Sequence, residues 1–411
     1  MRQQIYSNFE PQKIFFKNFI LTEKKYNVLF LCSWYPNRII PQLGNFVQKH
    51  AECVALYANV AALHVRSDAK INTTYDVIQE TRNNVFTVNI YYKKNNFLPI
   101  ISKIIKAQRY LKANYIGYKI ICKHFGKPNL VHLNVINPAG IFALILKKTQ
   151  NIPYIISENS THFLDSNSNK YKKNIYHLFT KICVINAARV CPVSQDLTNA
   201  MQRKGMTGNY EIVPNVVDTH LFNISAEKQN EKFQFIHIST LKEDHKNVSG
   251  IIRTVAKLAE INADFELHII HENENAIEAK AFAKELNMLD KKIFFEGPKS
   301  TSEVAEMLSK SDCLLLFSNY ENLPCVIVEA MACGVPVIST DVGGIAEHLN
   351  KLNGIILKPR DESALLNSML DMINDSKRFS SEKIREYAVT NFSYEAVGRK
   401  FLEIYQQIKP L

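Results

Sequence analysis

One segment of this 411-residue chain joins an apolar run, a turn and a helix pattern to two acidic residues, and it constrains the fold most. The apolar run 313–317 is typical of a buried parallel strand. Residues 322–324 predict a turn, and Glu329 is expected to begin a helix that Gly334 ends. Glu321 and Glu329 then lie at the carboxyl end of a strand, where open α/β sheets bind their ligands.

The two acidic residues suit a ligand that carries both hydroxyl and phosphate groups. Carboxylates accept hydrogen bonds from hydroxyls, and the backbone N–H groups that begin a helix between them can hold a phosphate. The alternative is a charged surface helix after a core strand, which any doubly wound domain can show.

Apolar runs and helix patterns alternate along most of the chain, and 46% of its residues are hydrophobic. This alternation predicts two doubly wound α/β domains with Rossmann-like sheets. The expected organisation is an extension at 1–25, a first domain at 26–215, a second domain at 216–391 and a final helix at 392–411.

The spacing of the two glutamates, the run 329–338 and the run 340–347 resemble family 4 retaining glycosyltransferases, and the whole block 320–348 carries this resemblance. The resemblance implies the GT-B fold, in which two Rossmann-like domains face a central cleft. It also implies transfer of a sugar, with retention of configuration, from a nucleotide-diphosphate donor to a saccharide or lipid-linked saccharide. Such a reaction belongs to surface polysaccharide or glycan synthesis.

The resemblance implies roles for the donor side. Glu329 would bind the ribose hydroxyls and Glu321 the sugar hydroxyls. Lys246 and the backbone N–H groups of Asn322 and Leu323 would stabilise the departing diphosphate, where developing charge most needs electrostatic help. Two further positions complete the expected donor site: Thr240, which stands where the family has Arg, and Gly297, whose backbone would approach the nucleotide base.

The resemblance is looser in the amino-terminal half. Gly44 and Asn45 follow a loop that would approach the phosphate or the transferred sugar. Asn159 stands where the family has a His that faces the donor sugar, and His162 could supply the imidazole instead. Asn215 is expected to line the cleft. In the same half, Arg38 is either an acceptor contact or a solvated loop charge.

No metal or cofactor is expected. The donor region contains no Asp-x-Asp, and the resemblance implies metal-independent transfer with a UDP- or GDP-linked sugar as co-substrate. The eight cysteines are scattered without a Cys-x-x-Cys pair, which indicates reduced thiols in the cytoplasm.

The net charge of +11 is unevenly distributed. Residues 81–157 contain twelve Lys or Arg and no Asp or Glu. Within them, residues 97–112 predict a basic amphipathic helix whose apolar face comprises Ile101, Ile104, Ile105 and Leu111. Such a helix suits an anionic membrane at the inner face of the cell, or is simply a solvated basic face packed on the sheet. No nucleic-acid motif accompanies it.

Two other functions share the predicted fold. An inactive nucleotide-sugar-binding protein is one, because Thr240, Val216 and Asn159 depart from the family pattern. A phosphorolytic or epimerising enzyme of the same architecture is the other. Release of nucleotide from UDP- and GDP-sugars separates the binding protein from an enzyme.

Overall fold

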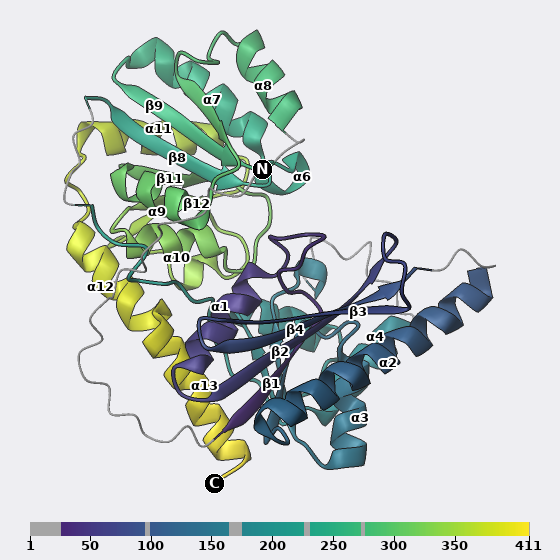
Figure 1. The fold of residues 1–411 in the computed structure, drawn as a ribbon. Helices are drawn as coiled ribbons and strands as arrows, with labels where there is room; N and C mark the ends of the chain where they lie inside the picture. Colours follow the sequence, from purple (N-terminus) through teal and green to yellow (C-terminus); the bar gives the residue numbers. More distant parts are fainter. Residues whose placement is uncertain (1–25, 95–98, 164–174, 226–230, 273–275, 411) are drawn as a thin grey trace, which may run out of the picture.

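The computed structural model describes residues 26–94, 99–163, 175–225, 231–272 and 276–410. They form two α/β domains, each built on a largely parallel sheet (Figure 1). The predicted pair of doubly wound domains is therefore confirmed. The extension expected at residues 1–25 lies outside the described residues.

The first domain has a seven-stranded sheet in the order β3-β4-β2-β1-β5-β6-β7. All neighbouring pairs are parallel except β3 and β4, which form an antiparallel hairpin at the edge. Its strands are β1 (Asn27–Cys32), β2 (Asn59–Asp68), β3 (Tyr75–Arg82), β4 (Val85–Lys93), β5 (Leu130–Asn134), β6 (Tyr154–Glu158) and β7 (Arg189–Pro192).

Helices cover both faces of this sheet, because alternate strand residues are apolar on both sides. One face packs against α1 and the carboxyl-terminal helix, and the other packs against α2, α3 and α4 (Figure 1). The helices of this domain are α1 (Asn45–Ala55), α2 (Pro99–Phe125), α3 (Gly140–Gln150), the 3-10 helix η1 (Thr161–Phe163), α4 (Ile175–Asn186) and α5 (Gln195–Arg203).

The second domain has a six-stranded parallel sheet in the order β10-β9-β8-β11-β12-β13. Its strands are β8 (Phe233–Ser239), β9 (Phe265–His271), β10 (Ile293–Gly297), β11 (Cys313–Leu316), β12 (Val337–Thr340) and β13 (Gly354–Leu357). Its helices are α6 (Glu243–Lys246), α7 (Val248–Ile261), α8 (Ala276–Glu285), α9 (Thr301–Lys310), α10 (Cys325–Ala332), η4 (Ile345–Glu347) and α11 (Glu362–Asn374).

The chain ends in two helices, α12 (Ser381–Phe392) and α13 (Tyr394–Ile408), and α13 packs against α1 of the first domain (Figure 1). The Tyr405 hydroxyl is 2.7 Å from Nδ1 of the buried His132. The N–H of Val217 donates to the carbonyl of Phe392 at 2.8 Å, so the chain passes between the domains twice at neighbouring places.

Two helix predictions were wrong in their bounds. Helix α10 begins at Cys325 rather than at Glu329, because Pro324 already provides its amino-terminal cap. Helix α2 continues to Phe125, because apolar residues such as Tyr118 and Ile121 keep the helical spacing and pack on the sheet. None of the described helices combines the length and apolarity that spanning a bilayer requires.

Candidate active site

Lys246 and Glu321 form an ion pair at the carboxyl edge of the second sheet. Lys246 ends α6, which follows β8, and Glu321 lies in the loop between β11 and α10. The hydroxyl of Ser318 donates to the same carboxylate at 2.7 Å. The Lys246 and Glu321 side chains are 17% and 11% exposed, so both charges stay near the surface of the site while facing each other.

A second ion pair joins the two domains. Nζ of Lys49, on α1 of the first domain, lies 2.6 Å from Oε1 of Glu329, on α10 of the second. Their side chains are 16% and 12% exposed. Burial, the largest single influence, disfavours the ammonium charge, but Glu329 and other acidic neighbours together hold the pKa of Lys49 above its ordinary value. Sequence reasoning missed Lys49, because its partner stands 280 positions away.

Three asparagines connect the domains beside these pairs. The side-chain amide of Asn159 donates to Oδ1 of Asn215 at 2.8 Å, and that of Asn215 donates to the carbonyl of Leu323 at 2.6 Å. The side-chain amide of Asn322 donates back to the carbonyl of Asn159 at 2.5 Å. The structure therefore brings together four residues that the sequence placed in the site: Asn159, Asn215, Asn322 and Leu323.

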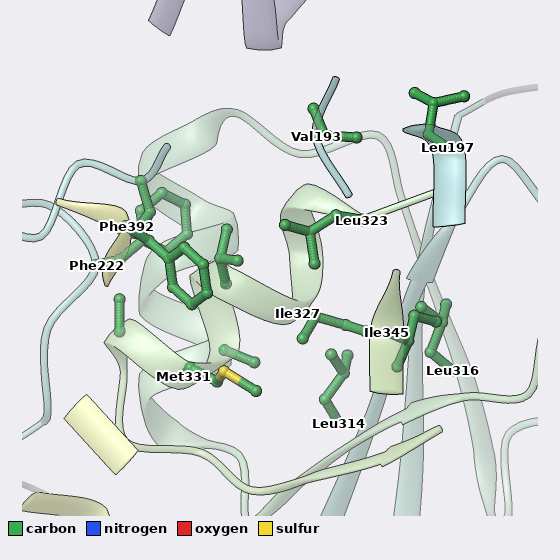
Figure 2. Packing of buried hydrophobic residues seen from close by; sticks show 14 of the residues in the cluster. Val193, Leu197, Phe222, Leu314, Leu316, Leu323, Ile327, Met331, Ile345 and Phe392 are labelled. Carbon is green, nitrogen blue, oxygen red and sulfur yellow. The ribbon is translucent and has the colours of Figure 1, made fainter. Parts of the chain in front are cut away.

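Apolar side chains of both domains also pack together beside these asparagines. Figure 2 shows Leu323 between Val193 of the first domain and Ile327 of α10, with Leu197 nearby. These four side chains are at most 2% exposed. The turn that carries Asn322 and Leu323 is thus anchored on the first domain as well as on its own helix.

Glu158 is a buried positioning residue that the sequence did not single out. Its carboxylate accepts hydrogen bonds from the backbone N–H groups of Ile136 at 3.2 Å, Asn159 at 3.1 Å and Ser160 at 2.9 Å. Burial raises the pKa of Glu158, while these three hydrogen bonds act in the opposite direction. The carboxylate fixes the backbone at Asn159 and ties it to the loop after β5.

Glu347 closes the junction on its other side. Its carboxylate accepts the backbone N–H groups of Gln195 at 2.8 Å and Asp196 at 2.9 Å, at the amino-terminal end of α5. A carboxylate is favoured at this end of a helix, where unpaired N–H groups gather. A Cβ atom on Gly344 would lie 2.4 Å from the Cβ of Ser194, so only glycine allows this close approach.

The loop between β8 and α6, the helix that carries Lys246, contains a residue with an uncommon backbone conformation. Leu241 is buried with φ of 53°, a left-handed conformation that is uncommon for a bulky residue. The ring of His245 contacts the Tyr320 ring edge-on at 4.5 Å between centroids. Burial and then the neighbouring Lys246 and Lys242 lower the pKa of His245, so its ring adds no full charge here at neutral pH. Thr240, on this loop, is exposed.

The remaining predicted residues make other contacts. Gly44 has φ of 71° and caps α1, where an added Cβ would lie 2.7 Å from the backbone of Trp34. The side chain of Asn45 bonds to Gln42, and His162 is exposed on η1. Arg38 is not a free loop charge, because it pairs with Asp68 at 2.8 Å and with Asp76 at 2.5 Å.

Gly343 offers a direct test of how tightly this site is built. It has φ of 59°, and an added Cβ would lie 2.0 Å from the carbonyl oxygen of Glu321. Gly297 is a matched control, because its φ is 68° but an added Cβ would meet nothing within 4 Å. We expect Gly297→Ala to cost about 1 kcal/mol of unfolding free energy, and Gly343→Ala to cost at least about twice that. If thermal denaturation shows equal losses of stability for the two variants, the Glu321 loop shifts at little cost to make room for the added Cβ.

The cluster therefore contains two carboxylates, two ammonium groups and several amides contributed by both domains. Across the described part of the chain, no group of three or more His, Cys, Asp or Glu side chains could hold a metal ion. Positive charge in the site comes from Lys246 and Lys49. These lysines can meet an anionic group, and the carboxylates can meet hydroxyls.

Comparison with known proteins places this arrangement in a class. The model of the glycosyl transferases group 1 matches residues 221–390, and that of glycosyltransferase family 4 matches residues 69–221. Two solved structures share the fold: sucrose-phosphate synthase from Thermosynechococcus elongatus and Anabaena Alr3699/HepE in complex with UDP and glucose. The first has a TM-score of 0.75 at 17% identity, covering 93% of this chain and 99% of that one. The second has a TM-score of 0.70 at 14% identity, covering 94% and 100%.

The fold is thus the GT-B architecture of two Rossmann-like domains. The two family matches adjoin and together extend from residue 69 to residue 390. The chain belongs to the family 4-like glycosyltransferases with this fold.

Three proteins with similar sequences carry different names. The chain is 30% identical to N-acetyl-alpha-D-glucosaminyl L-malate synthase of Bacillus anthracis over 183 residues, which are 44% of this chain and 46% of that protein. It is 24% identical to a putative teichuronic acid biosynthesis glycosyltransferase, TuaC, of Bacillus subtilis over 67% of each. It is 25% identical to lipopolysaccharide 1,6-galactosyltransferase of Escherichia coli over 47% of this chain and 54% of that protein. These alignments span about half to two thirds of the relatives' length.

Proposed function

We propose that the chain transfers a sugar from a nucleotide-diphosphate donor to a hydroxyl of a saccharide or lipid-linked saccharide, with retention of anomeric configuration. One observation carries the proposal: Lys246, Glu321 and Glu329 gather at the edge where the two domains meet. Such a site can hold the phosphates, the sugar and the ribose of one extended ligand.

Each residue has a role in the proposed reaction. Lys246 leaves Glu321 and neutralises the diphosphate, whose charge grows as its bond to the anomeric carbon breaks. Glu321, freed by that exchange, accepts hydrogen bonds from sugar hydroxyls, and Glu329 accepts them from the ribose. The backbone N–H groups at Asn322 and Leu323 add donors for the phosphates, and Asn159 faces them from the first domain.

A protein that binds nucleotide sugars without transferring them is the second candidate. Thr240 is exposed where the family has Arg, and His162 is exposed as well. The discriminating experiment incubates the protein with UDP- and GDP-sugars and a lipid extract, and measures nucleotide release. Steady release with sugar recovered in product supports transfer. Stoichiometric binding without release supports the second candidate.

Transfer is expected to be independent of divalent metal. Lys246 and the backbone N–H groups near Asn322 supply the positive potential that a bound cation supplies elsewhere. The rate of nucleotide release in excess EDTA should therefore equal the rate without it. A loss of activity that Mg²⁺ or Mn²⁺ restores would contradict this expectation.

The proposed acceptor is lipid-linked, and the proposed setting is the cytoplasmic surface of the cell membrane. The basic stretch 81–157 lies entirely in the first domain. Within it, α2 places Lys103, Lys106 and Lys112 on its exposed side. Basic residues near an anionic bilayer favour binding by about 1 kcal/mol each, and no nucleic-acid partner is proposed.

A further inference from the structure

Three helices of the first domain form a layer without acidic residues. Helices α2, α3 and α4 cover one face of the sheet (Figure 1) and contain nine Lys or Arg but no Asp or Glu. The opposite face differs, because α1 carries Glu52 and α13 carries Glu395 and Glu403. The charge asymmetry is therefore a property of one side of the folded domain and not only of a stretch of sequence.

The apolar side of α2 is not available to a membrane. Tyr110, Ala113, Tyr118 and Ile121 are buried against the sheet, and Ile105 and Leu111 are half-buried. The predicted apolar face is thus only partly exposed at those two residues, and the side chain of Ile101 lies outside the described ones. What α2 exposes is mainly basic, with Ile104 and Tyr115 among the lysines.

Helix α4 exposes the apolar surface that α2 does not. Leu178, Ile182 and Ile185 are 58%, 41% and 54% exposed. Their spacing of four and three residues places them on one side of the helix, while Cys183 and Val184 on its other side are buried.

Helix α3 extends this surface. Ile141 and Ile145 are exposed one helical turn apart. Nζ of Lys147 donates to the carbonyl of Asn186 at 2.6 Å, which holds the carboxyl-terminal end of α4 against α3. The five exposed side chains on α3 and α4 are called the apolar stripe: Ile141, Ile145, Leu178, Ile182 and Ile185.

We propose that the apolar stripe docks on an anionic lipid bilayer, with the lysines of α2 contacting the headgroups. Charge complementarity selects this occupant, because an acid-free basic layer beside exposed aliphatic side chains matches the headgroup and acyl regions of such a surface. A nucleic acid would use the charge but not the stripe. The proposal deepens the proposed function by placing its lipid-linked acceptor at this face.

The test is sedimentation with vesicles in the absence of donor and acceptor. The purified chain is mixed with vesicles of phosphatidylcholine alone or with phosphatidylglycerol added, at about 0.02 M and about 0.5 M salt. We expect wild-type protein to sediment with the anionic vesicles at low salt and to be partly released at high salt. Wild-type protein that stays in the supernatant at low salt overturns the proposal.

Two sets of variants separate the stripe from the charge. Leu178→Ser/Ile182→Ser should reduce partitioning about tenfold and make the remaining binding fully salt-sensitive. Lys103→Ser/Lys106→Ser/Lys112→Ser should reduce it about a hundredfold at low salt, at about fivefold per base. Arg109 is left in place because its guanidinium donates to the carbonyl of Lys93 at 2.6 Å.

Ile277→Ser is the matched control for the stripe. Ile277 is 73% exposed on α8 of the second domain. Its replacement should leave partitioning unchanged. The proposal is overturned if Leu178→Ser/Ile182→Ser partitions as the wild type does. It is also overturned if the wild type is a dimer and this variant dissociates it without changing vesicle binding. A chain that binds vesicles but releases no nucleotide would refute the transfer reaction and leave the docking surface standing.

Discussion

Replacement of Lys246 by Met is expected to lower kcat for sugar transfer by about 10²–10³-fold, the usual cost of removing one electrostatic stabiliser of a developing anion. The ammonium group of Lys246 is paired with Glu321 at the edge of the second sheet, and in the proposed reaction it moves to the departing diphosphate. Initial rates of nucleotide release measure the loss. A variant with near wild-type turnover would show that the diphosphate lies elsewhere.

This substitution needs a charge-balanced companion. Removing one partner of a partly buried pair leaves the Glu321 carboxylate uncompensated, which itself destabilises a fold. Lys246→Met/Glu321→Gln should therefore recover thermal stability without recovering turnover. Lys257→Met is the surface control, because Glu362 keeps its bond to Arg253 at 2.6 Å and activity should not change.

Replacement of Glu329 by Gln is expected to raise the KM for the donor by about tenfold to a hundredfold, with a smaller effect on kcat. Hydrogen bonds from ribose hydroxyls to a carboxylate are stronger than those to a neutral amide, by about 1.5–3 kcal/mol in total. The ribose lies away from the bond that breaks, so its binding affects the ground state and the transition state alike. Donor titrations of the initial rate separate KM from kcat.

Lys49→Met is expected to act in the opposite direction. In the structure Lys49 forms an ion pair with the Glu329 carboxylate, to which the ribose would bind. Replacement of Lys49 frees that carboxylate and should lower the donor KM by a few-fold. If Lys49→Met instead raised the KM as Glu329→Gln does, Lys49 would orient the carboxylate for the ribose rather than compete with it.

The strand-end chemistry could be predicted from sequence because it is local. The apolar run before Glu321 and the turn before α10 lie within twenty residues of one another, and parallel strands share their carboxyl edge. The resemblance to family 4 added Lys246 and Asn215, which the structure places at the same edge and at the domain junction. The fold class followed from the alternation of strand and helix patterns.

Contacts between distant segments could not be predicted in this way. Nothing in the sequence around Lys49 indicates Glu329 as its partner, since the pair exists only when the two domains meet. The same holds for the Glu347 carboxylate at the start of α5, 151 residues away. His162 was considered as an imidazole source from spacing alone, and the structure shows it exposed on a 3-10 helix.

Some missed elements did carry a local signal. Asn83 and Asn84 both have positive φ, as a two-residue hairpin turn requires, and Asn is favoured there. The pair of asparagines between alternating apolar residues could therefore have indicated the β3–β4 hairpin. Helix α4 was harder to recognise, because Leu178, Ile182 and Ile185 are apolar on its exposed side and blur the amphipathic pattern.

The most direct test of the donor site is calorimetric titration of UDP and of GDP into the wild-type chain and into Lys246→Met/Glu321→Gln. It requires neither the sugar nor the acceptor, and it probes the residues on which the proposed function rests. We expect one of the two nucleotides to bind the wild type. Its affinity for the double variant should be at least about tenfold lower. Absence of binding by both nucleotides, or equal affinity for the two proteins, would contradict a nucleotide-sugar site at Lys246, Glu321 and Glu329.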